Sequence, residues 1–239
     1  MKRYTLDPDL IGLDRFMQLT RNRRMLPSRL ELHKQMDECF ASLRMAGISS
    51  LGDLIRALGS KSKREAFSTQ TGLAVEYLVL LKREAGSYLA RPFPLSTFPG
   101  IPYEYAEVLK SRGLANTRDF FEKVQMPEQK AQVSKETGIP VARLKELHAL
   151  CDLSRITGVG GVFARVVYEA GIRSTREFAI SDAPEHYRLY MAIIEKYKYA
   201  AGHFSEGDIR YCIEYARVVA EADEINEILR EILGNAPAP

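Results

Sequence analysis

Cysteine is scarce in this chain of 239 residues. It occurs three times, at positions far apart in the sequence: Cys39, Cys151 and Cys212. An odd number of widely spaced cysteines argues against a disulfide framework and against paired-cysteine metal sites. We therefore expect buried free thiols, and no metal or other cofactor.

Long apolar segments are also missing. No run approaches the about 20 residues that a membrane-spanning helix needs. The first thirty residues mix charged and apolar side chains, unlike the apolar core of a signal peptide. With 46% hydrophobic and 27% charged residues, the composition is that of folded globular proteins. We expect a soluble, cytoplasmic chain with no membrane partner.

Groups typical of enzyme sites are few. Three histidines stand without a carboxylate at metal-ligand spacing, and there is no glycine-rich phosphate loop: His33, His148 and His186. His203, Asp208 and Cys212 come nearest to a catalytic grouping, but their spacing matches no known geometry of a nucleophile and its base. We expect a non-enzymatic protein.

The formal net charge of +3 is small, but it is unevenly distributed. Residues 1–29 hold seven Lys/Arg against three acidic residues, and residues 206–239 hold three against eight. The three stretches between them are nearly neutral. Opposite charges at the two ends fit either a phosphate-facing N-terminus or ends that attract each other, within one chain or between chains.

The sequence repeats itself. Residues 45–50 align with residues 111–116, and residues 71–78 align with residues 137–144, both at a step of 66. A third copy follows the second at a step of 58, where Gly100 and Ala106 map onto Gly158 and Ala164. We predict five segments: an N-terminal basic segment at 1–29, helical repeats at 30–91, 92–150 and 151–205, and an acidic C-terminal helix with a short tail at 206–239.

Local signals predict that each repeat is helical. Gly47, Gly113 and Gly171 each follow an apolar-periodic stretch, which is typical of a helix that ends on a left-handed glycine. Pairs of cap-forming residues then precede the next apolar turn: Ser49-Ser50, Asn116-Thr117 and Ser174-Thr175. Alternating strand patterns are missing, so we expect an all-α fold.

Residues 153–167 fit the helix-hairpin-helix pattern, an apolar residue two before Gly-apolar-Gly and an alanine four after it. The glycines permit unusual backbone angles, Val159 fills the space between the two helices, and Ala164 lets those helices approach closely. The second helix then begins with free amide groups that point outward.

Residues 30 to about 200 resemble a family of tandem helix-hairpin-helix proteins that is classed as a domain of unknown function. The features that carry the resemblance are the Thr-Gly-Ile turn at 137–139, the run Cys151-Asp152-Leu153-Ser154-Arg155-Ile156 and the Gly-Val-Gly hairpin. The resemblance implies tandem SAM-like helical repeats with extra C-terminal helices. It also implies that the hairpin amides bind a backbone phosphate of DNA without reading its sequence.

The candidate phosphate site consists of Gly158, Val159, Gly160 and Gly161, and we expect Arg155 and Arg165 to assist. Further arginines could face the phosphates or lie on a solvated helix face: Arg173, Arg176, Arg21, Arg23, Arg24 and Arg29. The leading hypothesis is therefore sequence-independent binding of double-stranded DNA.

The sister hairpins depart from the DNA-binding pattern. In the second copy the turn is Gly100-Ile101-Pro102, where Pro102 removes an amide and Glu104 brings a negative charge. The first copy has Lys34-Gln35-Met36 in place of the glycines. We expect only the third copy to be capable of binding phosphate.

The alternative is a protein-interaction scaffold of stacked repeats without a nucleic-acid ligand. Val162 and Phe163 stand where DNA-binding hairpins carry lysine or small polar residues, and they could form an apolar contact surface. The acidic C-terminal segment carries Ile225, Ile228, Leu229 and Ile232 at helical spacing. We expect an amphipathic helix there that packs on the repeats or binds a partner.

Six tyrosines lie between residues 187 and 215. Tyr187, Tyr190, Ile194 and Tyr197 follow steps of three and four, which favours one buried stripe of a helix over a platform for unpaired bases.

Overall fold

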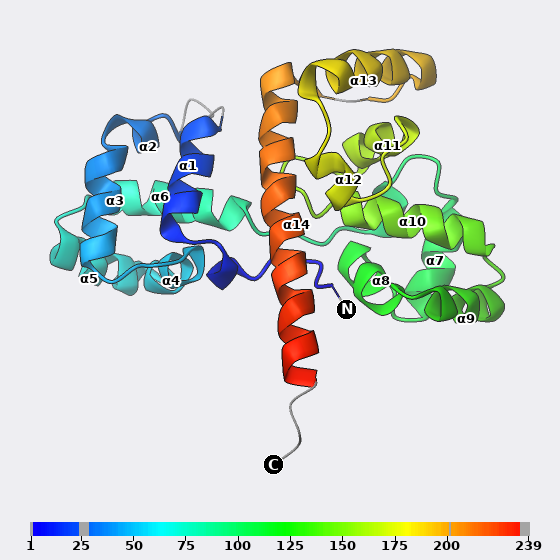
Figure 1. The fold of residues 1–239 in the computed structure, drawn as a ribbon, viewed down its shortest axis with the longest axis horizontal. Helices are drawn as coiled ribbons and strands as arrows, with labels where there is room; N and C mark the ends of the chain where they lie inside the picture. The colour runs from blue at the N-terminus through cyan, green and yellow to red at the C-terminus, as the bar shows by residue number, and fades with distance from the viewer. Residues whose placement is uncertain (1, 24–28, 201, 235–239) are drawn as a thin grey trace. The chain divides into compact units, whose positions relative to one another are not determined.

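The computed structural model describes residues 2–23, 29–200 and 202–234, and in these residues the chain is all-helical. The described residues form fourteen α-helices and two short 3-10 helices, and the only extended pairings among them are two isolated bridges (Figure 1). The all-α prediction is confirmed. Arg24 and residues 235–239, named in the predictions above, lie outside the described residues.

The chain divides into two compact units, Asp7–Leu89 and Met1–Leu6 together with Ala90–Pro239. The predicted segments 92–150, 151–205 and 206–239 thus belong to one unit. The basic segment 1–29 is divided between the two units after Leu6.

The unit Asp7–Leu89 is built from short helices around an aromatic core. Phe16 lies between Phe40 and Tyr88, with ring centroids 5.9 and 5.2 Å away. All three rings are fully buried. The elements of this unit are η1 (Pro8–Leu10), α1 (Leu13–Asn22), α2 (Glu31–Lys34), α3 (Met36–Met45), α4 (Leu51–Ala57), α5 (Lys61–Thr71) and α6 (Val75–Ser87).

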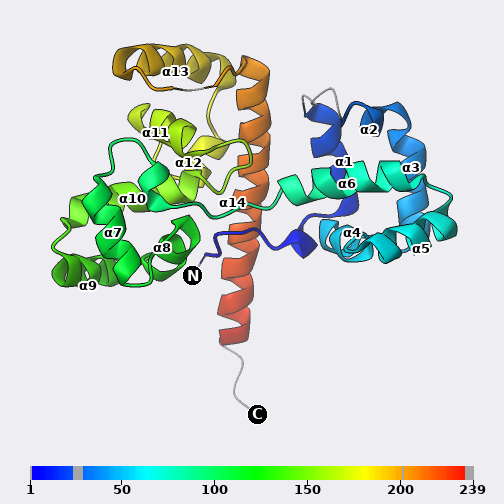
Figure 2. The ribbon, with the colours of Figure 1, turned by 180° about the vertical axis from the view of Figure 1, so that it is seen from behind.

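The larger unit ends in a long helix, which packs on α12 and α13. In Figures 1 and 2, α13 lies beside the N-terminal end of this helix. The elements of the unit are η3 (Leu95–Thr97), α7 (Tyr103–Ser111), α8 (Thr117–Lys123), α9 (Pro127–Thr137), α10 (Val141–Leu153), α11 (Gly161–Glu169), α12 (Thr175–Ala179), α13 (Ala183–Tyr197) and α14 (Glu206–Gly234).

Helix lengths recur at the 66-residue step of the sequence repeat. The helices α4 and α8 have 7 residues each, α5 and α9 have 11, and α6 and α10 have 13. Gly72 and Gly138 end α5 and α9 with the same left-handed geometry, φ 73° and ψ 0°. A side chain other than glycine is strained at such angles, so these two glycines end the helices where a β-carbon would not.

The predicted starts and ends of the short helices are confirmed. Gly47, Gly113 and Gly171 all have positive φ, between 76° and 96°. The side chains of three residues cap the helices that follow by accepting a hydrogen bond from the third residue after each of them: Ser50, Asn116 and Ser174. Local sequence thus determines where α4, α8 and α12 begin.

Candidate functional site around the Gly158 turn

The turn between α10 and α11 has the local geometry that its sequence predicts. Gly158 has φ +93°, a conformation that favours glycine. Val159 is buried and its amide donates to the carbonyl of Ile156 at 2.9 Å. Ala164 is fully buried at the start of α11, where α10 and α11 pack together. Val159 therefore fills the space below the turn.

The tip of the turn is partly covered by neighbouring elements. A β-carbon at Gly158 would lie 3.0 Å from the sulfur of Cys212 in α14, and one at Gly161 would lie 2.9 Å from the carbonyl oxygen of Thr97 in η3. Gly160 is exposed, and nothing lies within 4 Å of where its β-carbon would be. It begins α11 without a side-chain cap. Of the three glycines, Gly160 has the most open surroundings.

Arg155 does not face solvent. Its side chain is 1% exposed, and its guanidinium binds Asp223 of α14 through two hydrogen bonds of 2.6 and 2.8 Å and Asp152 of α10 through one of 2.8 Å. Removing a guanidinium from two buried carboxylates leaves unpaired charges in the core, so the pairing of Arg155 gives no support to a phosphate contact there. The assistance to phosphate binding that we expect of Arg155 stays a prediction.

The Asp152 carboxylate at the end of α10 binds the first residue of α12. In the first two copies the first amide of α4 or α8 donates to a backbone carbonyl, Ile11 or Phe93. The amide of Thr175, at the same place in α12, donates instead to the Asp152 carboxylate at 2.9 Å. Burial raises the pKa of Asp152, but the charge of Arg155 and these hydrogen bonds outweigh it and lower the pKa below its usual value.

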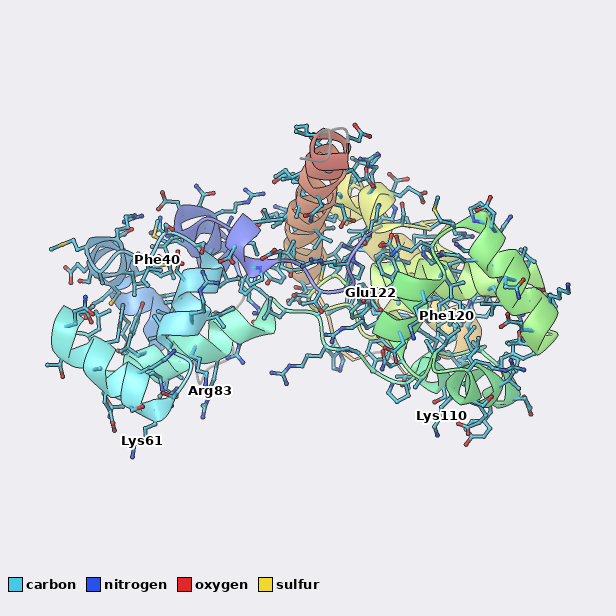
Figure 3. The ribbon with its side chains drawn as sticks, turned by 90° about the horizontal axis from the view of Figure 1, so that it is seen from below. Phe40, Lys61, Arg83, Lys110, Phe120 and Glu122 are labelled. Atoms are coloured by element: carbon cyan, nitrogen blue, oxygen red, sulfur yellow. The ribbon has the colours of Figure 1, made fainter. Side chains whose placement is uncertain are left out.

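The N-terminal residues complete this cluster. Tyr4 is fully buried, its carbonyl accepts from Arg155 Nε at 3.3 Å, and its amide donates to Glu122 of α8 at 2.8 Å (Glu122 is labelled in Figure 3). Lys2 lies 3.5 Å from the Asp223 carboxylate. The cluster around Arg155 thus connects residues 2–6, α8, α10, α12 and α14 within one unit. Its role is structural.

Arg165 is also buried, and it contacts the second copy's turn instead of its own. Its side chain is 4% exposed and binds Glu146 at 2.7 Å and Glu169 at 3.4 Å. Its Nε donates to the carbonyl of Pro99 at 2.7 Å, and its guanidinium lies against Gly100. Here too the expected phosphate contact stays a prediction, and two carboxylates already neutralise the guanidinium.

Val162 and Phe163 are half-buried. The ring of Phe163 packs against Tyr190 of α13 and Phe204, with centroids 5.4 and 5.1 Å away. Of the predicted stripe on α13, Tyr190 is fully buried, whereas Tyr187 and Ile194 are half-buried. Tyr197, by contrast, is 45% exposed. Most of the apolar surface predicted at Phe163 is used inside the unit.

The second copy's turn shares a left-handed glycine with the Gly158 turn, whereas the first copy's turn has none. Gly100 has φ +78°, and Pro102 caps α7 without a hydrogen-bonding side chain. In the first copy Gln35 separates α2 from α3 with φ −133°, so that turn lacks a left-handed residue.

Three of the other candidate arginines are also paired with carboxylates. Arg23 and Arg29 both bind the fully buried Glu84 at 2.6 Å, and Arg21 binds Asp37 at 2.6 Å. A shallow groove on the unit Asp7–Leu89 is lined by Arg56, Ala57, Lys63, Ala66, Phe67 and Gln70. Its most basic group, Arg56, is held by Asp9 and Asp53.

Two members of the His203, Asp208 and Cys212 grouping have contacts in the structure. Asp208 accepts from the amide and the hydroxyl of Ser205, and Cys212 lies 3.5 Å from the carbonyl of Thr157. All three cysteines are buried thiols outside any disulfide, as predicted. Among the described residues, no group of three or more His, Cys, Asp or Glu side chains is arranged so that it could hold a metal ion.

The C-terminal helix changes character along its length. Up to Asp223 most of its residues are buried, whereas residues 224–234, which we call the distal segment, carry exposed isoleucines. Ile225 is 43% exposed, Ile228 50% and Ile232 62%. The distal segment, red in Figure 1, extends beyond α12. No helix among the described residues has a stretch apolar and long enough to span a membrane.

Sequence reasoning missed the partners of the two arginines. The spacing of Asp152 and Arg155, three residues apart, could have indicated a local ion pair. Asp223 and Glu146 carried no such signal, because they lie 68 and 19 residues from the arginines that they bind.

Comparison with known proteins gives one family. A family model described as a domain of unknown function (DUF4332) matches residues 99–217. No curated protein and no solved structure matches significantly. The match begins one residue before Gly100, ends inside α14, and includes Arg155 and the Gly158 turn. Residues 99–217 therefore form a DUF4332 domain, a family to which no function is assigned.

Proposed function

We propose that the chain is a non-enzymatic protein-interaction scaffold whose contact surface is the distal segment of α14. The observation that carries the proposal is the row of exposed Ile225, Ile228 and Ile232 on one helix. Single exposed apolar residues are common on protein surfaces, but a contiguous row marks an interaction site. Its spacing of three and four residues places the three side chains on one face.

The charges of the larger unit support a protein partner over DNA. The unit holds twenty-one Lys/Arg and twenty-one Asp/Glu. Sequence-independent DNA binding depends on several cations that each neutralise a phosphate. With Arg155 and Arg165 already neutralised by carboxylates, the Gly158 turn has lost the two cations nearest to it in sequence.

In this proposal the repeats are helix-hairpin-helix units used for packing. The buried Val159, the positive φ of Gly158 and the buried Ala164 support this assignment of the third copy. Arg165 and Gly161 pack on the second copy's segment 97–100, so the two turns support each other. Stacked repeats of this kind form rigid supports for a binding element.

Duplex DNA is the second candidate ligand, and one observation favours it. Gly160 is exposed and begins α11 without a side-chain cap, so the positive end of the helix dipole is open there. Duplex affinity that falls as salt is raised, and that is lost in Gly160→Asp, would support DNA.

One experiment separates the two candidates. A photoreactive amino acid is introduced at Ile228 in one variant and at Gly160 in another, and the cells that make the variants are irradiated. We expect a nuclease-resistant adduct from position 228 and none from position 160. A matched control carries the same group at Ile180, an isoleucine that is 83% exposed but lies outside α14.

The opposite pattern of photo-adducts would support duplex DNA as the ligand. A nuclease-sensitive adduct from position 160, with no adduct from position 228 above the level seen at position 180, would overturn the scaffold proposal.

A further inference from the structure

Positive charge is concentrated around one turn of the unit Asp7–Leu89, the turn at Gly59 that connects α4 to α5. Residues 56–64 include four cations and no acidic residue: Arg56, Lys61, Lys63 and Arg64. The helix α6, which packs on both α4 and α5, adds Lys82 (Figure 1). We call Lys63, Arg64 and Lys82 the Gly59-turn cations.

The Gly59-turn cations converge on the backbone at the end of α4. Each donates to a carbonyl oxygen at 2.9 to 3.3 Å, and the pairs are Lys63 with Arg56, Arg64 with Leu58, and Lys82 with Gly59. Three side chains from two helices thus bind a backbone segment of four residues. Their charges lie close together as a consequence.

The carboxylates near the turn are taken by the other two cations. Arg56 binds Asp9 and Asp53, and Lys61 lies 3.8 Å from Glu65. Among the described residues, no carboxylate forms an ion pair with a Gly59-turn cation. Backbone carbonyls satisfy the hydrogen bonds of these cations but carry no net charge, so the repulsion between like charges is not offset.

Helix dipoles do not neutralise the turn either. The C-terminal end of α4 contributes about half a negative charge and the N-terminal end of α5 about half a positive one, and the two ends meet at this turn. The first turn of α5 holds no acidic residue, although acidic side chains stabilise that position. The turn therefore keeps the positive charge of its side chains, and Lys63 is exposed to an anion.

A shallow groove begins at this charge. Lys63, Ala66, Phe67 and Gln70 follow the spacing of one face of α5, and together with Arg56 and Ala57 of α4 they line the groove. Its apolar part consists of Ala57, Ala66 and Phe67, of which Phe67 is only 7% exposed. The groove is thus positive at one end, apolar along its length and neutral at Gln70.

We propose that this groove binds an acidic peptide segment of another protein. The carboxylates of the peptide lie at the Gly59-turn cations, and an apolar side chain of the peptide lies against Ala57, Ala66 and Phe67. Clusters of basic side chains recognise acidic motifs in this way. The surface goes beyond the proposed function, because it belongs to the other unit and needs no residue of the distal segment.

The apolar lining favours a peptide over nucleic acid. A duplex presents phosphates and sugars to a protein surface, which would leave the apolar part of the groove without a contact. Unpaired bases would need an exposed aromatic ring on which to stack, and Phe67 is buried. An acidic peptide with an apolar residue uses both ends of the groove.

Binding of defined probes to the full chain tests the proposal. The probes are a fluorescent peptide of repeated Glu-Leu-Glu units, the same peptide with Gln in place of Glu, and an unlabelled DNA duplex as a competitor. Fluorescence anisotropy at low salt should show binding of the acidic peptide, which weakens as salt is added. The Gln peptide should not bind, and the duplex should not displace the acidic peptide.

The double variant Lys63→Gln and Lys82→Gln removes two charges, while glutamine can still donate to the same carbonyls. Its affinity for the acidic peptide should fall at least about fivefold. Lys123→Gln with Lys135→Gln is the matched control, because it removes the same charge at two exposed lysines of the larger unit. This control should bind like the parent, and so should Lys63→Arg with Lys82→Arg, which keeps the charge.

Three results would overturn the proposal: no binding of the acidic peptide at low salt, equal binding by the parent and the Gln double variant, or displacement of the peptide by the duplex. The last of these would assign the Gly59-turn cations to nucleic acid. None of them bears on the proposed function, which depends on photo-adducts from position 228. Ile228→Gln should bind the acidic peptide like the parent.

Discussion

Arg155, Phe121 and His148 form a stack of side chains in the larger unit. Arg155 stacks over the Phe121 ring at 4.8 Å from the centroid, and Phe121 stacks in turn on His148. Burial and then the charge of Lys130 lower the pKa of His148 to about 4. A histidine held neutral in the core makes folding depend on pH.

The pH dependence has a definite sign. Because the pKa of His148 in the folded chain lies below its usual 6.5, the unfolded chain takes up a proton first as the pH falls. The contribution of His148 is thus complete above about pH 6.5 and is lost between about pH 6.5 and 4. From pH 7 to pH 5 we expect the larger unit to lose about 2 kcal/mol of its free energy of unfolding.

Urea unfolding at the two pH values measures this loss. In His148→Gln the difference between pH 7 and pH 5 should shrink by most of that amount, whereas His203→Gln, at an exposed position, should leave it unchanged. An unaltered pH difference in His148→Gln would contradict the assignment.

At the scale of elements, glycines in one turn serve different needs. Gly161 lets α11 approach η3, since a β-carbon there would lie 2.9 Å from the Thr97 carbonyl. Gly160, one residue earlier, stands in open space as the N-cap of α11. Packing thus requires glycine at position 161, whereas position 160 has room for a side chain.

The same substitution at the two glycines should have opposite effects. Gly161→Ser must displace η3 or α11 and should cost about 1–3 kcal/mol. Gly160→Ser supplies a cap oxygen to α11 and should raise stability by a few tenths of a kcal/mol. Urea unfolding followed by circular dichroism compares the pair, and equal losses at both positions would refute this account of the turn.

At the scale of the whole molecule, the chain leaves the larger unit after Leu6 and returns to it at Ala90. Residues 2–6 belong to that unit through specific contacts. Besides its bonds to Arg155 and Glu122, Tyr4 packs edge-on against Phe121, with centroids 6.1 Å apart. The unit Asp7–Leu89 is therefore an insertion between two parts of one fold.

Tyr4→Ala tests this topology. Removing a fully buried aromatic side chain costs about 3–5 kcal/mol, and the loss should fall on residues 90–234 and not on residues 7–89. Hydrogen exchange resolved by peptide measures both. Tyr103→Ala, at a tyrosine that is 65% exposed in the same unit, should leave exchange in both regions unchanged. Equal acceleration in the two units would contradict the insertion.

The sequence by itself determined the helices and their limits. The caps at Ser50, Asn116 and Ser174 and the left-handed glycines are local signals, because the groups that satisfy them lie within a few residues. The helix lengths that recur in the structure follow the 66-residue step of the sequence repeat. The shape of the Gly158 turn could also be predicted, since Val159 and Ala164 have their roles within one hairpin.

Only the tertiary structure decided what the arginines of the turn do. Whether Arg155 and Arg165 face solvent depends on Asp223, Glu146 and the Pro99 carbonyl, which packing brings to them from distant positions. The same holds for α14, which carries apolar residues on both sides of Asp223. Its division into a buried part and an exposed distal segment is set by the elements that pack on it, α12 and α13 among them.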